Sequence, residues 1–235
     1  MSLIPIAFAS ALLLLTHLGF SGPLRPLLVS QLGERGFLIF FTLTAALTLA
    51  MLIWMFGQSP RTRYFWYPSP ENYLLSKVLA APAMLLLAGA LLVRNPSALG
   101  QGALAASADR GAAAARGIHR ITRHPLLWAV VFWSVSHLVS NGDRAAVVFF
   151  GTFLALALLG TFALDARKNR AGAPGWAAFR AATSNVPCAA LLSGRSGSAS
   201  GKRALAELIG PLLLGAVLYA VGFYGHRWLG GVDLY

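Results

Sequence analysis

Long apolar runs separated by short polar connections dominate this chain. Six of these runs are close to the roughly 20 residues that a helix needs to cross a lipid bilayer. They cover approximately residues 3–20, 37–56, 73–93, 125–140, 145–164 and 204–224. A helix satisfies its own backbone hydrogen bonds, which the bilayer core cannot do. The pattern therefore predicts an all-α polytopic transmembrane bundle of about six spanning helices, forming one membrane domain over residues 1–235.

The segments between the runs are of two kinds. Trp176, Phe179 and Ala182 recur at helical spacing, which predicts a short amphipathic helix in the membrane interface. Two segments rich in Ala, Gly and Ser, residues 95–117 and 193–201, have no apolar pattern of their own. We expect these two segments to be linkers.

The composition agrees with a membrane location. The chain is 57% hydrophobic and only 11% charged, yet its formal net charge is +12. With so few charged residues, basic loops against anionic cytoplasmic lipid explain this charge better than a nucleic-acid partner, and we expect no nucleic acid to bind. Alternate connections hold 14 and 5 of the 19 Lys and Arg residues. This asymmetry predicts that both termini face the periplasm.

Two histidines lie inside apolar runs. An ionisable side chain at bilayer depth needs a partner, so His17 and His137 are candidate functional residues. Two buried histidines on separate helices are what a heme b needs for two axial ligands, and both are candidate metal ligands. The alternative is that each imidazole bonds a neighbouring Thr or Ser and holds two helices together.

A basic cluster precedes the run at 125–140. His124 lies 13 residues before His137, which on one helix means a rotation of roughly 220° and a separation of about 20 Å, so the two cannot share a metal. We expect Arg120, Arg123 and His124 to hold an anionic group at the cytoplasmic end, such as a heme propionate, a lipid phosphate or a cofactor carboxylate. A cap on the helix that begins at Pro125 is the alternative.

Other chemistries have little support in the sequence. There is no nucleophile elbow, no glycine-rich phosphate loop and no zinc-protease helix motif. The seven acidic residues are too few for a paired-carboxylate site in the membrane, although Asp165 is placed to join the basic cluster. The single cysteine, Cys188, excludes an intramolecular disulfide.

Several short motifs, spread over nearly the whole length, resemble the NnrU family of bacterial membrane proteins and its relative, 15-cis-zeta-carotene isomerase. They are Thr16-His-Leu-Gly-Phe-Ser-Gly, Arg120-Ile-Thr-Arg-His-Pro, Ser136-His-Leu, Asn141-Gly-Asp and His226-Arg-Trp-Leu-Gly-Gly-Val. The resemblance implies a protein of the bacterial inner membrane associated with nitrite and nitric oxide reduction, or an isomerase acting on a lipophilic polyene. It also implies heme b held by the histidines that correspond to His17 and His137.

One position departs from the isomerase. The isomerase has a cysteine three residues before its second histidine, and this chain has Ser134 there. A redox-driven exchange of thiolate and imidazole ligands is therefore not expected.

A second resemblance covers residues 117–192. Their Arg-His-Pro start and their tail with Val186-Pro187 are similar to membrane methyltransferases of the isoprenylcysteine carboxyl methyltransferase type. This resemblance implies S-adenosylmethionine as an alternative cofactor, but the adjacent glutamates of those enzymes are missing.

Overall fold

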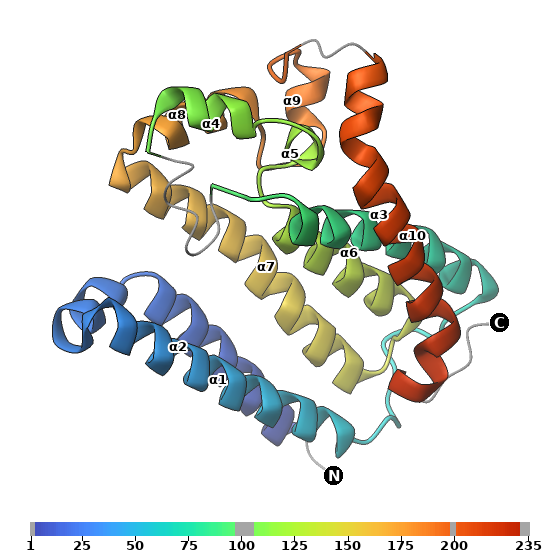
Figure 1. The fold of residues 1–235 in the computed structure, drawn as a ribbon. Helices are drawn as coiled ribbons and strands as arrows, with labels where there is room; N and C mark the ends of the chain where they lie inside the picture. Colours follow the sequence, from blue (N-terminus) through green and yellow to red (C-terminus); the bar gives the residue numbers. More distant parts are fainter. Residues whose placement is uncertain (1–2, 97–105, 198–200, 231–235) are drawn as a thin grey trace. The chain divides into compact units, whose positions relative to one another are not determined.

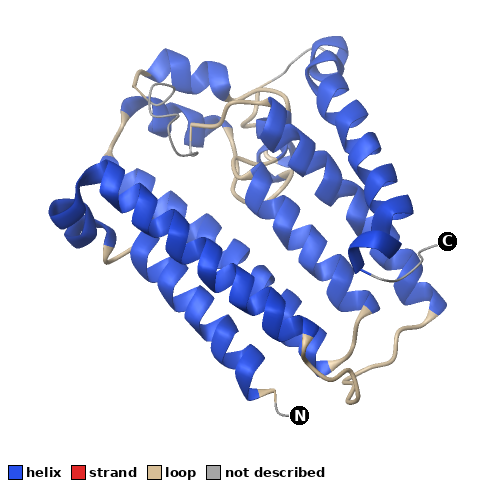
Figure 2. Ribbon diagram, turned by 60° about the horizontal axis from the view of Figure 1, so that its bottom comes forward, coloured by secondary structure: helices blue, strands red, loops and turns tan. Residues whose placement is uncertain are grey.

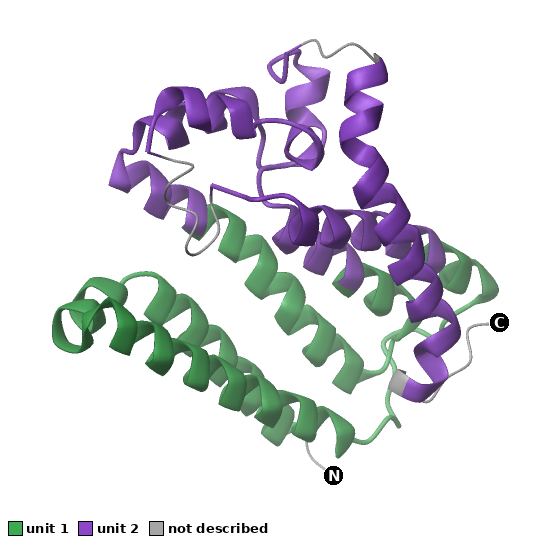
Figure 3. Ribbon diagram, viewed as in Figure 1, with its two compact units in different colours: residues 1–76, 134–163 green, residues 77–133, 164–235 purple. Residues whose placement is uncertain are grey.

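The structure is a computed structural model that describes residues 3–96, 106–197 and 201–230. Those residues contain helices and connecting loops but no β-strand, and Figures 1 and 2 show this arrangement. The chain divides into two compact units whose residues interleave along the sequence, coloured separately in Figure 3. Unit 1 comprises residues 1–76 and 134–163, and unit 2 comprises residues 77–133 and 164–235. The all-α class predicted from the apolar runs is confirmed.

Five helices are long and apolar enough to cross a membrane within the described part of the chain. They are α1 (Ile4–Ser21), α2 (Arg25–Gly57), α3 (Pro70–Leu92), α7 (Arg144–Ala171) and α10 (Gly201–Gly230). The sixth predicted span is α6 (Pro125–Ser140), which is equally apolar but has only 16 residues. The chain is thus a multi-pass membrane protein, and each predicted run coincides with a helix.

Unit 1 is built on the antiparallel pair α1 and α2, which lie side by side in Figures 1 and 2. Gly33 interrupts α2 with a φ of 67°, a conformation that glycine adopts without strain. The first turns of α2, before Gly33, form a separate short helical segment. The predicted span, which begins near residue 37, therefore covers only the part of α2 that follows the break. The remainder of α2, beyond Gly33, is continuous to Gly57.

The second end of unit 1 is fixed by backbone contacts around the turn between α6 and α7. Tyr64 and Asp143 form an isolated antiparallel bridge, and Phe65 N donates to Gly142 O at 2.8 Å. A side chain at Gly142 would overlap the carbonyl of Trp66, so this close approach requires glycine. The connection that follows α2 is therefore held against the C-terminal end of α6.

Unit 2 contains the short helices that surround its polar cluster. They are α4 (Ala108–Ala114), α5 (Ile118–Ile121), α8 (Pro174–Ala182) and α9 (Ala189–Leu192). Trp176 and Phe179 of α8 are buried against Ala115, at the end of α4. The helix predicted near residue 176 thus exists, but its aromatic face is covered by protein and not by lipid.

The predicted linkers need one correction. Residues 108–114 of the segment 95–117 form α4, and Gly111 packs directly on the backbone of Gly175 in α8. Their small side chains, which looked featureless in the sequence, allow this close approach between two helices. Within the two linkers, residues 97–105 and 198–200 lie outside the described residues.

Candidate functional sites

His17 lies in α1, four residues before the helix ends. Its ring packs on Phe41 of α2, with the ring centroids 4.9 Å apart. The Nδ1 atom is buried and has no hydrogen-bond partner among the described residues. A buried nitrogen without a partner is costly in an apolar environment, so the site calls for a ligand or a proton partner.

His137 lies three residues before the end of α6. Its ring stacks on Phe150 of α7, with the centroids 4.6 Å apart and the planes at 28°. One turn earlier on α6, Ser134 is fully buried, and its Oγ has no partner within the described part of the chain. Position 134, which carries the departure from the isomerase, is therefore a fully buried hydroxyl whose hydrogen-bonding capacity is unused among the described residues.

The two histidines belong to the same unit but do not fit one heme as a pair. His17 is level with Phe41, whereas His137 is connected through Phe150 to Phe56 near the other end of α2. Two axial nitrogens on one metal lie about 4 Å apart, since imidazole nitrogen–metal bonds are about 2 Å long. Taken singly, the half-buried imidazole of His17, with its buried Nδ1, has the donor chemistry that a metal ligand requires.

The basic residues before α6 meet a carboxylate of this chain. Arg123 donates to both carboxylate oxygens of Asp165, from Nε at 2.9 Å and from Nη2 at 2.7 Å. His124 Nε2 lies 2.7 Å from Asp165 Oδ1, and Asn185 Nδ2 donates to Oδ2 at 3.3 Å. The expectation that Asp165 joins this cluster is confirmed.

The same cluster joins three parts of the sequence that lie far apart. Arg123 Nη1 donates to the carbonyl of Thr183, and Thr122 Oγ1 donates to the carbonyl of Asn185 at 2.6 Å. Trp128 Nε1 reaches Asn185 Oδ1 at 3.3 Å. The start of α6, the C-terminal part of α7 and the tail after α8 are thus linked by hydrogen bonds.

Arg120 is engaged elsewhere in unit 2. Its Nη1 donates to the carbonyl of Ser196 at 3.1 Å, and its Nε lies 3.7 Å from Glu207 Oε2 in α10. Glu207 Oε2 also accepts a hydrogen bond from Gly117 N at 2.8 Å. An external anion, such as a cofactor carboxylate, would have to displace these internal contacts at Arg120, as at Arg123 and His124.

His119 is a buried residue that the sequence interpretation missed. It is fully buried in α5, where Nδ1 contacts the carbonyl of Ala114 at 3.0 Å and the ring packs edge-on against Phe179. Burial lowers the pKa of His119 to about 4, outweighing the opposing effect of the Ala114 carbonyl. The signal in the sequence was its place next to Arg120, four residues before the Arg-His-Pro motif.

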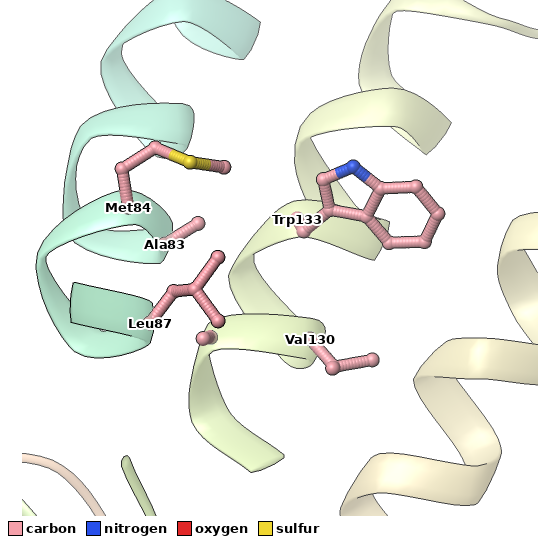
Figure 4. Close-up of a pocket in the computed structure, with 6 residues that line it drawn as sticks. Ala83, Met84, Leu87, Val130 and Trp133 are labelled. Carbon is pink, nitrogen blue, oxygen red and sulfur yellow. The ribbon is translucent and has the colours of Figure 1, made fainter. Parts of the chain in front are cut away.

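Unit 2 also contains an apolar cavity of about 250 Å³ between α3 and α6, shown in Figure 4. Its lining consists of Ala83, Met84, Leu87, Ala129, Val130 and Trp133. Within residues 3–96, 106–197 and 201–230, no group of three or more His, Cys, Asp or Glu side chains is arranged to hold a metal ion. The cavity therefore suits a hydrocarbon segment better than a polar ligand.

These features define a polytopic, all-α membrane protein with two histidines inside the helices of one unit and a hydrogen-bonded polar cluster in the other. The family model described as NnrU protein matches residues 5–234, nearly the whole chain. The chain therefore belongs to the NnrU protein family. No curated protein and no solved structure matches it.

Proposed function

We propose that this protein binds heme b in the membrane and acts either as a cis–trans isomerase-like enzyme on a lipophilic polyene or as an accessory of nitrite and nitric oxide reduction. The observation that supports it most directly is the ring of His17, whose Nδ1 is buried without a partner in an apolar helix pair. When bound, heme b supplies an iron centre that can change oxidation state and coordinate a ligand.

The chain's own residues prepare this site in simple ways. Phe41 packs on the imidazole of His17, and Phe37 stacks on Phe41 at 5.8 Å, which restricts the orientation of the ring and excludes water from it. Thr16 Oγ1 donates to the carbonyl of Leu12 at 2.7 Å, so its hydroxyl does not compete for the imidazole. The Nδ1 atom of His17 is therefore available as a metal ligand.

A lipophilic substrate has support of a different kind. The cavity between α3 and α6 is lined by apolar side chains, and its volume of about 250 Å³ is below the range of about 300–1,000 Å³ typical of drug-sized ligands. It can therefore hold part of a polyene chain and not a whole one. Small residues on the facing helices, Ala83 and Ala129, leave the space.

The first experiment is an absorption spectrum of detergent-purified protein, expressed with ample heme supply. A Soret band that responds to dithionite supports heme binding, and purified protein without heme refutes the proposal. Conversion of a cis polyene by the reduced, heme-loaded protein would favour the isomerase-like role. Loss of nitrite or nitric oxide reduction in a deletion strain would favour the accessory role.

We also propose a bacterial inner membrane location with both termini in the periplasm, from the asymmetry of 14 against 5 basic residues. Cysteines introduced at Ser107 and at Gln58, in a Cys188→Gly background, test this with a membrane-impermeant maleimide on intact spheroplasts. Cys188 has a φ of 64°, so glycine fits its backbone. Labelling at position 58 but not at 107 supports the orientation, and the reverse pattern inverts it.

Methyl transfer has less support. The geometry does bring together the Arg-His-Pro start, the end of α7 and the tail at Asn185, as the resemblance to methyltransferases implies. However, the carboxylate at that place, Asp165, already accepts hydrogen bonds from Arg123, His124 and Asn185. A group as polar as S-adenosylmethionine therefore finds no free carboxylate there, and saturable binding of S-adenosylmethionine would overturn this view.

A further inference from the structure

We infer that His17 and His137 serve two separate sites at opposite ends of unit 1, so that a heme bound by this chain takes one of these imidazoles as a ligand, and not both. The inference rests on the proposed heme and specifies how it is ligated. It differs from the paired ligation that the sequence resemblance implies.

The length of α2 gives the distance along the helix axis between the positions of the two imidazole rings. His17 packs on Phe41 at 4.9 Å, and Phe41 and Phe56 are 15 residues apart in the part of α2 that follows the break at Gly33. At 1.5 Å per residue, this separates the two phenylalanines by about 22 Å along the helix axis. The ring of His17 therefore marks one end of this stretch of α2.

His137 lies near the C-terminal end of α2, where Phe56 is found. Its ring stacks on Phe150 at 4.6 Å, and Phe150 lies 5.9 Å from Phe56 in an edge-on contact. Phe56 also stacks on Phe149, the neighbour of Phe150, at 4.0 Å. These contacts connect the ring of His137, through the single ring of Phe150, to the end of α2 that Phe56 marks.

The positions of the two histidines near the ends of α1 and α6 also indicate that they lie far apart. His17 lies near the end of α1, where the chain turns into α2. His137 lies near the end of α6, where Trp66 Nε1, in the connection that follows α2, donates to the carbonyl of Val139 at 3.4 Å. One histidine thus lies near the end of α1, level with Phe41, and the other lies near the connection that follows α2; α1 ends at Ser21 and does not bring them level.

The separation gives each histidine its own surroundings. The site of His17 is aromatic and aliphatic, with a buried nitrogen left over. The site of His137 adds the buried, unpartnered hydroxyl of Ser134 one turn away, which suits a ligand that carries a hydrogen-bonding group. If one of these imidazoles held heme b, the group would supply an iron centre that can coordinate a further small ligand.

A cross-linking experiment tests the separation without any heme. Two double variants are made in the Cys188→Gly background, Phe56→Cys with Phe150→Cys and Phe41→Cys with Phe150→Cys, and both are treated with a short homobifunctional thiol reagent in membranes. We expect a yield several-fold higher for the 56/150 pair than for the 41/150 pair. Because both variants carry the same change at Phe150, any loss of packing there affects them equally. Efficient cross-linking of the 41/150 pair overturns the inference.

A spectroscopic experiment tests the ligation. We expect a high-spin heme, lost in one of the single variants His17→Ala and His137→Ala and retained in the other. A low-spin heme that is lost or turned high-spin in both single variants would show paired ligation and overturn the inference, while leaving the proposed function standing. Protein that never binds heme defeats the proposed function, and the cross-linking result then still decides whether the two sites are separate.

Discussion

The polar cluster of unit 2 and the two histidines inside the helices of unit 1 have different surroundings. In unit 2, Arg123, His124 and Asp165 contact one another, and Arg120 lies beside Glu207. In unit 1, the two histidines inside the helices pack on aromatic rings, His17 on Phe41 and His137 on Phe150.

This difference determines which of these side chains can still bind an external ligand. A guanidinium and a carboxylate cancel each other's charge and can be buried together, but they then have little left to offer an external ligand. An imidazole can be buried in its neutral form and still present a nitrogen lone pair. The Arg123–Asp165 pair of unit 2 therefore stabilises the fold. Among the described residues, the buried imidazole nitrogens that have no partner are Nδ1 of His17 in unit 1 and, in unit 2, Nδ1 of His124 and Nε2 of His119.

The largest expected effect comes from opening the cluster of unit 2. Asp165→Asn keeps the shape of the side chain but leaves the buried charge of Arg123 without its counter-ion, which costs about 3–5 kcal/mol when a buried pair is broken. Thermal unfolding of the detergent-solubilised protein measures the loss. The matched control is Glu34→Gln, which removes an exposed pair with Arg25 and should cost about 0–1 kcal/mol. Equal melting temperatures for the two variants would mean that the cluster does not hold unit 2 together.

A smaller effect is expected where α4 meets α8. In Gly111→Ala the new methyl group would overlap the carbonyl oxygen of Gly175, and forcing such a contact costs about 1–3 kcal/mol. Gly151→Ala is the control in unit 1, because no neighbouring atom lies within 4 Å of the added carbon. Alanine in a helix interior is favoured over glycine by roughly 0.5–1 kcal/mol, so the control should melt at the same or a slightly higher temperature. A stable Gly111→Ala variant would show that α4 and α8 do not pack as described.

The third prediction concerns pH. The pKa of buried His119 is lowered from 6.5 to about 4, so between these values the unfolded chain binds more protons than the folded one. Stability should therefore fall as the pH decreases from about 6.5 to about 4 and level off below. His119→Asn keeps a donor for the carbonyl of Ala114 but does not titrate, so its melting temperature should change less over this window. The same pH dependence in both proteins would assign the effect to other groups.

The sequence predicted the membrane helices well because the requirement behind them is local. A helix crosses the bilayer if enough consecutive residues are apolar, and this can be counted along the chain. The predicted run at 73–93 corresponds to α3 at Pro70–Leu92, and the predicted run at 125–140 coincides with α6. The place of Asp165 in the basic cluster was also predictable, since a lone carboxylate at a basic helix end seeks a cation.

Other features depend on segments that are distant in sequence. Nothing near residue 185 indicated that Asn185 would bond both Asp165 and Trp128, or that residues 108–114 would form a helix against α8. The burial of His119 likewise comes from Ala114 and Phe179, which reach it only in the folded unit.

The sequence by itself determined that this is an all-α, multi-pass membrane protein, and which histidines lie inside its apolar helices, because hydrophobic length and the identity of a residue are written along the chain. Only the tertiary structure decided which partners those histidines meet. The levels of His17 and His137 depend on how α1, α6 and α7 align with α2, and that alignment is set by side-chain packing between helices, not by the apolar pattern within any one of them.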